Sequence, residues 1–413
     1  MEIPRLIKIR QSFNSEHIKD IEAEVKAQIN SIGISFKPGA SVAVAVGSRG
    51  IANIHRIVKA AVETLKDKGA KPFIIPAMGS HGGATAEGQA SVLESYGITE
   101  ETLGVPVKSS MQTVELPQGP LKTRVFMDKY AYEADGIVVI NRVKVHTDFH
   151  GTTESGLLKM CVIGLGKHKQ ALELHNYGVY GLRELVPATA REVLKSGKIT
   201  MGIGIVENAY DQTMVINAVL PKDMEKEEIK LLDINRRNMP GFPVGQIDVL
   251  IIDEMGKDIS GTGIDPNIIG KMKIRGQQDS NIPDISHIVV TDLTEASHGN
   301  ALGIGLADFI TKKLYDKIDF KATYENVLTS TFTERGKIPI IADTDRKAAE
   351  YSLRTCGHIE MESARIIRIK NTLKLNEIYV SGSILEEIKG KKDIEILGTF
   401  GEMFDPEGKL VEF

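Results

Sequence analysis

The sequence predicts an α/β fold with two α/β domains: an N-terminal domain on a Rossmann-like parallel sheet and a C-terminal domain of mixed α/β structure. Two observations predict it. Short, valine-rich apolar segments alternate with segments of helical periodicity from residue 41 onward, and the alternation starts afresh after a proline- and glycine-rich stretch at residues 238–246. A chain of 413 residues can build two domains of this kind. We expect the active site in the cleft between them.

The N-terminal domain opens with a strand–helix unit that occurs twice. SVAVAVG (41–47) is a short apolar run typical of a buried strand, and apolar residues recur at helical spacing over 51–65. KPFIIPA (71–77) is a second buried strand, and a helix follows it. This order predicts a parallel sheet whose strand ends meet at one edge. Further elements are expected in this domain: strands at 123–127, 136–140, 200–206 and 212–219, and a helix at 180–196.

The C-terminal domain begins at IDVLIID (247–253), a new buried strand after the proline- and glycine-rich stretch. The predicted N-terminal cofactor-binding domain therefore covers residues 1–246, with the C-terminal tail 400–413 as a candidate addition. The predicted C-terminal domain covers residues 247–399. We expect the following elements in it: strands at 288–291, 364–369, 376–380 and 393–397, and helices at 301–314 and 344–355.

The composition is that of an ordinary globular protein from a reducing compartment. Hydrophobic residues make up 42%, charged residues 26%, and the net charge of -4 offers no basic face for nucleic acid. No apolar run could span a membrane, and the N-terminus lacks the features of a secretory signal. Cys161 and Cys356 are too few for a disulfide framework or a four-cysteine metal site. We expect a cytoplasmic protein without nucleic-acid or membrane partners.

The familiar glycine-rich cofactor motifs are incomplete in this sequence. GLGKHK (164–169), GIGIVE (202–207) and GTGIDPN (261–267) offer Gly-x-Gly but lack the third glycine of the dinucleotide-binding fingerprint. There is also no phosphate-binding loop ending in Gly-Lys-Ser/Thr, no His-Glu-x-x-His motif and no Gly-x-Ser-x-Gly elbow. Conventional nicotinamide binding is therefore the weaker of the alternatives.

Two chemically versatile residues follow the first two predicted strands. Arg49 lies in GSRG and His81 in SHGG. An arginine at a strand end can bind a carboxylate or phosphate through two hydrogen bonds, and a histidine between flexible residues titrates near neutral pH. The alternatives are a surface ion pair for Arg49 and an ordinary loop histidine for His81. If the two strands are neighbours, both side chains face one crevice.

The stretch HTDFHGTTESGLLKMCVIGLGKHKQALELHNY (146–177) concentrates the remaining candidates. Lys159 stands in an apolar run, where burial would lower its pKa and make it a candidate for covalent attachment; the alternative is a strand-end lysine that reaches solvent. His146 and His150 are rival proton-transfer groups, and His175 is a candidate metal ligand. His168, between two lysines, is expected to be solvated.

Two loops of the second domain are candidates for substrate binding. DEMGKDISGTGIDPNIIGK (253–271) follows a strand and ends at Lys271, and TEASHGNALGIGLAD (294–308) carries His298 in its turn. Both stretches are rich in glycine and polar residues, as binding loops at strand ends are. Ordinary turn chemistry is the alternative explanation. Lys271 and His298 are therefore predicted substrate contacts.

Taken together, these residues resemble the nickel-pincer nucleotide-dependent lactate racemase family. The pattern that carries the resemblance is the strand-end arginine (Arg49), the Gly-Ser-His-Gly loop (His81), and a block with Val-His (His146), Ser-Gly-x-x-Lys (Lys159) and His-Asn (His175). Their order and approximate spacing fit the family, as does the division into two domains.

The resemblance implies a cofactor and a reaction. The cofactor is a nickel-pincer nucleotide, pyridinium-3,5-bisthiocarboxylic acid mononucleotide nickel, with His175 as the protein ligand to the metal and Lys159 as the residue that can bind it covalently. His81 and His146 are implied as acid/base groups, and Arg49 as a substrate contact. The reaction is racemisation or epimerisation of a 2-hydroxy acid by reversible hydride transfer.

Differences from the family's pattern bear on the substrate and leave two alternatives. We expect a hydroxy acid larger than lactate, such as a sugar acid. The alternatives are a nicotinamide-dependent dehydrogenase of a hydroxy acid and a non-catalytic protein that binds the nickel cofactor. The expected partners are a small hydroxy acid, the enzymes of cofactor biosynthesis, and a second copy of this chain.

Overall fold

The structure, a computed structural model, describes residues 3–48 and 50–413. The chain forms two compact units, the central unit Asn14–Met239 and the terminal unit made of Met1–Phe13 and Pro240–Phe413. Both units combine sheets with helices, so the predicted α/β fold class is confirmed. No helix in the described part of the chain is both long enough and apolar enough to cross a membrane.

The central unit is built on a five-stranded sheet in the order β3-β2-β6-β7-β8. The first four strands in this order run parallel and β8 runs antiparallel to β7. Because β2 and β6 are neighbours while the chain leaves them in opposite directions, the carboxyl edge between them is a topological switch point. The strands are β2 Ser41–Val46, β3 Lys71–Pro76, β6 Gly136–Arg142, β7 Ile199–Glu207 and β8 Thr213–Val219, with a separate hairpin of β4 Thr113–Leu116 and β5 Val125–Asp128.

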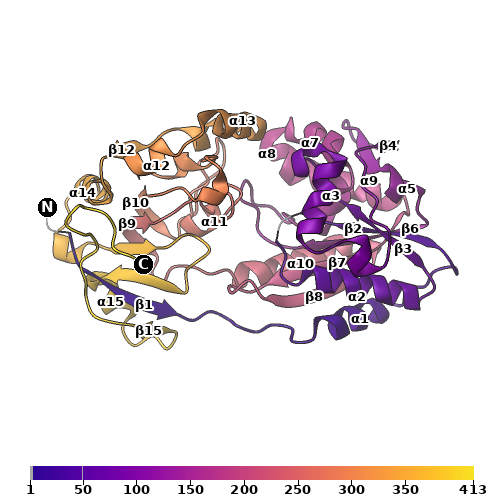
Figure 1. Cartoon of the computed structure of the whole chain (residues 1–413), viewed down its shortest axis with the longest axis horizontal. Coiled ribbons are helices and arrows are strands. Elements are labelled where there is room, and N and C mark those ends of the chain that lie inside the picture. The colour runs from indigo at the N-terminus through magenta and orange to yellow at the C-terminus, as the bar shows by residue number, and fades with distance from the viewer. Residues whose placement is uncertain (1–2, 49) are drawn as a thin grey trace. The chain divides into compact units, whose positions relative to one another are not determined.

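Helices cover both faces of this sheet because its strands are apolar on both sides. One face, with Val44 and Ile140, buries the apolar sides of α1 and α2, and the other, with Ala45 and Val139, packs against the segment that runs from α6 to α9 (Figure 1). The helices are α1 Ile21–Ser31, α2 Ile54–Asp67, α3 Ala86–Ser95, α4 Glu100–Leu103, α5 Lys129–Glu133, α6 Leu157–Lys159, α7 Lys167–His175, α8 Gly178–Tyr180, α9 Val186–Lys195 and α10 Met224–Arg237.

Two π-helical turns interrupt the helical segment that crosses the second face. They are η2 Met160–Gly164, directly after α6, and η3 Gly181–Leu185, directly before α9. Turns of this kind are frequent at functional sites. The first of them follows Lys159, so the lysine predicted to bind the cofactor lies at the end of a helical turn rather than on a strand.

The terminal unit contains a mixed eight-stranded sheet in the order β12-β11-β10-β9-β13-β14-β1-β15. Strands β12 to β13 in this order are parallel, and β14, β1 and β15 are each antiparallel to their neighbours. The strands are β1 Leu6–Gln11, β9 Gln246–Ile252, β10 Asp284–Val290, β11 Phe309–Thr311, β12 Ile340–Ala342, β13 Ile366–Ile369, β14 Glu377–Ser381 and β15 Ile394–Ile396; the helices are α11 Pro266–Ile269, α12 Lys312–Asp316, α13 Phe320–Ser330, α14 Asp345–Thr355 and α15 Gly382–Ile388.

The structure differs from the sequence prediction at two points. The predicted first domain includes the N-terminal residues, but β1 pairs with β14, and Gly401 of the tail exchanges backbone hydrogen bonds with Leu6, so both ends of the chain belong to the terminal unit. Apolar periodicity predicts a strand without naming its partner. The helix predicted at 301–314 is wrong: a short 3₁₀ turn, β11 and the start of α12 lie there, because Gly303 takes a left-handed φ of 95° and ends the helical path.

Candidate functional site

The predicted residues of the central unit follow the carboxyl ends of three adjacent parallel strands. Ser48 follows β2, His81 follows β3 and His146 follows β6, and these strands lie side by side in the sheet. The exposed His81 contacts the Ser48 hydroxyl through Nδ1. Arg49 lies outside the described residues. The structure therefore brings the β2 and β3 loops together at the carboxyl edge, next to the switch point between β2 and β6, as the strand order predicts.

Lys159 and His146 form the closest polar contact of this edge. Lys159 Nζ lies 2.5 Å from His146 Nε2, and His146 Nδ1 accepts the backbone N–H of Asp148 at 3.1 Å. Two nitrogen atoms this close cannot each carry a hydrogen that points at the other, so one of them donates a hydrogen bond and the other accepts it. The position predicted for covalent attachment and one predicted for proton transfer are thus in direct contact.

A buried glutamate holds the His146 loop in place. The side chain of Glu154 is fully buried, and its carboxylate accepts the backbone N–H of His146 at 2.5 Å and an N–H of Arg236 at 2.7 Å. Burial alone would raise the pKa of Glu154, but the contact with His150 and the hydrogen bonds from His146 and Arg236 outweigh it and lower the pKa. The side chain of His150 is 53% exposed and its Nδ1 faces Glu154 Oε1 at 3.4 Å. Of the two rival histidines, the structure sets His146 against Lys159.

His175 ends helix α7 with a fixed ring orientation. Its Nδ1 lies 2.5 Å from the backbone carbonyl of Ala171, which can only accept, so Nδ1 carries the proton and Nε2 keeps its lone pair. Burial is the main cause that lowers the pKa of His175, and the nearby positive charge of Lys159 lowers it further. Both effects favour the neutral ring, which is the form that binds metals. Among residues 3–48 and 50–413, no three histidine, cysteine, aspartate or glutamate side chains form a group that could hold a metal ion.

The segment Lys167-His168-Lys169 does not lie in solvent as predicted. Lys167 is fully buried and forms an ion pair with Asp128 at 3.1 Å. His168 is half-buried, and its Nδ1 lies 3.0 Å from the hydroxyl of Ser80, the residue before His81. Only Lys169 is exposed. The prediction was wrong because the partners of Lys167 lie on other elements, and nothing in the local sequence shows them.

A second buried carboxyl lies at the start of the turn that carries Lys159. Glu228 of α10 is fully buried, and its Oε2 accepts the backbone N–H of Leu158 at 2.8 Å. A Cβ at position 156 would lie 2.5 Å from Glu228 Cδ, so glycine is required there. Burial raises the pKa of Glu228 to about 7. No sequence signal indicated this residue, because α10 reads as a charged surface helix.

The pKa of Glu228 predicts a pH-dependent stability. A carboxyl whose pKa is higher in the folded than in the unfolded chain stabilises the fold below its unfolded pKa, and this contribution is lost as the pH rises through about 7. We expect the free energy of unfolding of the wild type to fall by about 3 kcal/mol between pH 5 and pH 8 through this group. Glu228→Gln should remove that part of the fall, and Glu227→Gln on the same helix should not. Urea unfolding at pH 5 and pH 8 measures the free energy of unfolding at each pH. The same fall between the two pH values in wild type and in Glu228→Gln would contradict the prediction.

Comparison with known sequences places the chain in a family. The profile described as "Domain of unknown function (DUF362)" matches residues 42–269, more than half of the chain. The chain belongs to the DUF362 family. The matched range contains every predicted site residue of the central unit. No curated protein matches the DUF362 chain.

Solved structures show what the fold of this DUF362 protein is similar to. The lactate racemase apoprotein from Thermoanaerobacterium thermosaccharolyticum superposes with a TM-score of 0.50 at 12% identity, over 90% of this chain and 99% of that one. A Thermotoga maritima protein from a structural genomics programme gives a TM-score of 0.49 at 12% identity, over 86% and 96% of the two chains. The lactate racemase similarity confirms the predicted fold, and at this identity it shows the fold alone.

The two predicted substrate residues of the terminal unit of the DUF362 protein lie apart. Lys271 Nζ lies 3.8 Å from Asp308 Oδ2 and 3.4 Å from Ser286 O, near the amino ends of β10 and β11. His298 is exposed in the loop after the carboxyl end of β10, with a left-handed φ of 46°. The structure therefore places them at opposite ends of the parallel strands, and their role in substrate binding stays a prediction.

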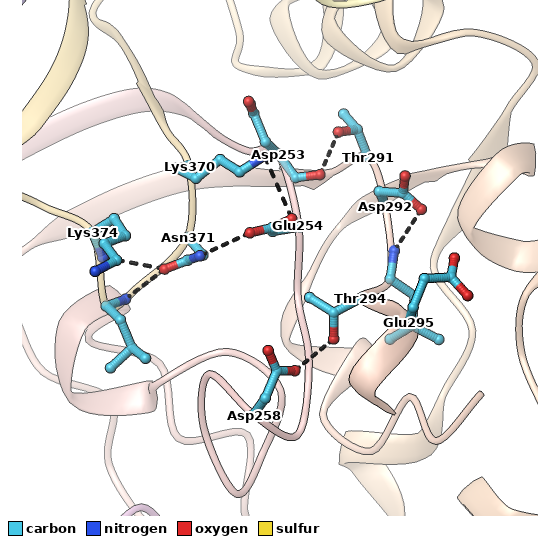
Figure 2. Close-up of polar contacts among 12 residues, drawn as sticks. Asp253, Glu254, Asp258, Thr291, Asp292, Thr294, Glu295, Lys370, Asn371 and Lys374 are labelled. Carbon is cyan, nitrogen blue, oxygen red and sulfur yellow. Dashed lines mark hydrogen bonds and ion pairs between the residues drawn. The ribbon is translucent and has the colours of Figure 1, made fainter. Parts of the chain in front are cut away.

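A polar cluster in the DUF362 protein that the sequence reasoning missed follows the carboxyl ends of β9, β10 and β13. Asn371 donates to Glu254 at 3.0 Å and Thr294 donates to Asp258 at 2.6 Å; Figure 2 draws both contacts. Asp253 lies beside them and pairs with the buried Arg368 at 2.8 Å. A cavity of about 280 Å³ opens here. The available signal was a charged residue one or two positions after each apolar strand, at Asp253, Asp292 and Lys370.

The central unit of the DUF362 protein also contains a larger cavity, of about 530 Å³. Its lining includes His17, Asn53, Arg56 and Thr213 and none of the predicted site residues. We therefore build the candidate site on the contacts at the strand ends and not on this cavity.

Proposed function

We propose that this DUF362 protein is a racemase or epimerase of a 2-hydroxy acid that uses a nickel-pincer nucleotide. The observation that carries the proposal is the contact between Lys159 and His146, 2.5 Å long, together with His175, which ends helix α7 with its Nδ1–H directed at Ala171 O. These are the residues to which the resemblance assigns attachment, proton transfer and metal binding. The similarity in fold to a lactate racemase apoprotein supports the proposal.

The residues present fit the cofactor. The Nδ1–H of His175 donates to Ala171 O, and a metal-binding histidine usually donates its other ring N–H in this way. Lys159 Nζ lies 2.5 Å from His146 Nε2, so the amine that would attach the cofactor has a ring nitrogen within reach for proton transfer. A cofactor that brings its own sulfur and carbon donors needs one protein ligand to the nickel. His175, whose Nε2 keeps its lone pair, is the candidate for that ligand.

The chain's own residues would position the substrate and move its hydroxyl proton. The chemistry expected from the bound cofactor is reversible hydride acceptance. His146, held by Glu154, and His81, held near Ser48, are the candidates to take the hydroxyl proton from the substrate and to return it. Two such groups on different loops can serve the two faces of a planar intermediate.

The proposed reaction also suggests how the substrate is bound and which partners the protein has. Arg49 is the proposed contact for the substrate carboxylate, because a guanidinium binds this group through two hydrogen bonds. Lys271 and His298 are proposed substrate contacts from the terminal unit. We propose a hydroxy acid larger than lactate, a cytoplasmic location, delivery of the cofactor by its biosynthetic enzymes, and self-association of the chain.

Isotope labelling tests this function and separates it from its rivals. The holoprotein would be incubated with 2-hydroxy acids, sugar acids included, that carry deuterium on the carbinol carbon. We expect the configuration to invert with the deuterium retained, because a hydride leaves and returns without meeting solvent. Replacement of deuterium by solvent hydrogen would indicate proton abstraction. Net oxidation with NAD would favour a dehydrogenase, and a nickel-loaded protein that inverts none of them would favour a binding protein.

A further inference from the structure

A buried lysine joins the loop of His81 to the segment that carries Lys159 and His175. Lys167 is fully buried and lies between Lys159 and His175 in the chain. Its Nζ pairs with Asp128 at 3.1 Å and donates to Gln89 Oε1 at 3.2 Å and to the backbone carbonyl of Pro76, the last residue of β3. One ammonium thus contacts three different elements.

Gln89 carries this connection to His81. Its amide nitrogen donates to the backbone carbonyls of Gly79 at 2.9 Å and His81 at 3.2 Å, and its side chain is fully buried. The path from Lys167 to the His81 backbone therefore consists of a buried hydrogen bond to Gln89 and a partly buried one from Gln89 to His81 O. Hydrogen bonds in such surroundings are strong and specific in orientation. His168, the next residue, contacts Ser80 of the same loop.

The backbone of Lys167 adopts a conformation that side chains rarely take. Its φ is 58°, in the left-handed region, at the turn between η2 and α7. A residue other than glycine held there is strained, and such strain persists where the surrounding contacts require it. The three contacts of the Lys167 ammonium are interactions that stabilise this conformation.

The geometry assigns Lys167, acting through Gln89, a positioning role: it fixes the loop that presents His81 relative to Lys159 and His175. The catalytic consequence of this inference rests on the proposed function. The link from Lys167 through Gln89 to the His81 loop is a property of the fold and can be tested without activity. The proton-transfer histidine and the two cofactor residues would then keep one relative position through a single buried charge. The role inferred for Lys167 and Gln89 is positioning, and neither residue transfers a proton.

Two variants test the role without leaving a buried charge alone. Gln89→Met keeps the side-chain volume and the Asp128–Lys167 pair but removes both donors to the loop. The double variant Lys167→Met/Asp128→Asn removes the pair together and keeps a residue that can cap α5. Lys169→Met, two residues along the same helix and exposed, is the matched control.

The first readout is amide hydrogen exchange, which needs no activity. The amides of His81 and Ala84 bond to Met78 O and Ser80 O within the loop. In Gln89→Met we expect these amides to exchange at least about tenfold faster while β2, β3 and β6 keep their protection. Unchanged exchange at His81 and Ala84, or an increase spread evenly over the sheet, would overturn the positioning role.

The second readout is kinetic, on holoprotein. We expect kcat to fall at least about tenfold in Gln89→Met, with KM and nickel content within about twofold of wild type, because only the acid/base loop is displaced. Faster loop exchange with an unchanged kcat would overturn the role in catalysis. If the wild type itself inverts no substrate, the proposed function fails, and the exchange experiment still decides whether Lys167 and Gln89 fix the loop.

Discussion

Replacing His175 with alanine is expected to lower the nickel retained per chain at least about tenfold, since it removes the proposed protein ligand of the metal. His175 suits this role because Ala171 O accepts its Nδ1–H and because burial lowers the pKa of the ring, which favours the neutral, metal-binding form. The measurement is metal analysis of protein made together with the cofactor-making enzymes. His168→Ala, on the same helix, is the matched control and should keep its nickel.

The same preparations separate the ligand from the attachment site. Lys159→Ala should lose any covalent mass increase while retaining part of the nickel, because His175 is intact. An equal nickel content in wild type and His175→Ala would show that His175 is not the nickel ligand. Loss of nickel in His168→Ala with retention in His175→Ala would transfer the ligand role to the other histidine of α7.

Replacing His146 with asparagine is expected to reduce kcat by about 10²–10⁴-fold, the usual contribution of a positioned acid/base group. His146 contacts Lys159 and is held by Glu154, whereas His150 is exposed and faces Glu154 from the surface. His150→Asn should therefore keep kcat within about threefold of the wild type. His81→Asn should lose activity like His146→Asn if the two serve opposite faces.

The control for this prediction is the nickel content, which should stay at the wild-type level in the asparagine variants at positions 81 and 146. A variant that has lost its metal says nothing about proton transfer. If His150→Asn loses its activity and His146→Asn keeps it, the proton-transfer residue is His150 and not His146.

The strands of the central unit were predictable because they are short apolar runs with clear ends. The runs expected at 41–47 and 71–77 correspond to β2 and β3, and the run at 136–140 lies within β6. Their parallel order then placed Ser48, His81 and His146 at one edge. This much depends only on local periodicity and on the geometry of parallel sheets.

The rest depended on contacts that the local sequence does not show. Lys167 reads as a solvated lysine, and its burial requires Asp128 and Gln89 from distant elements. Glu228 reads as part of a charged surface helix, yet it accepts the N–H of Leu158 in the turn that carries Lys159. The partner of β1 could not be predicted either, because an apolar pattern indicates a strand but not the strand with which it pairs.

The most direct test of the central claim is native mass spectrometry with metal analysis on wild-type protein made together with the enzymes of cofactor synthesis. We expect about one nickel per chain and a mass increase equal to the mass of the cofactor. The cofactor stays on the denatured chain if it is attached at Lys159 and dissociates if it is not. A protein that shows the mass of the bare chain under native conditions, with nickel at background, would contradict the account.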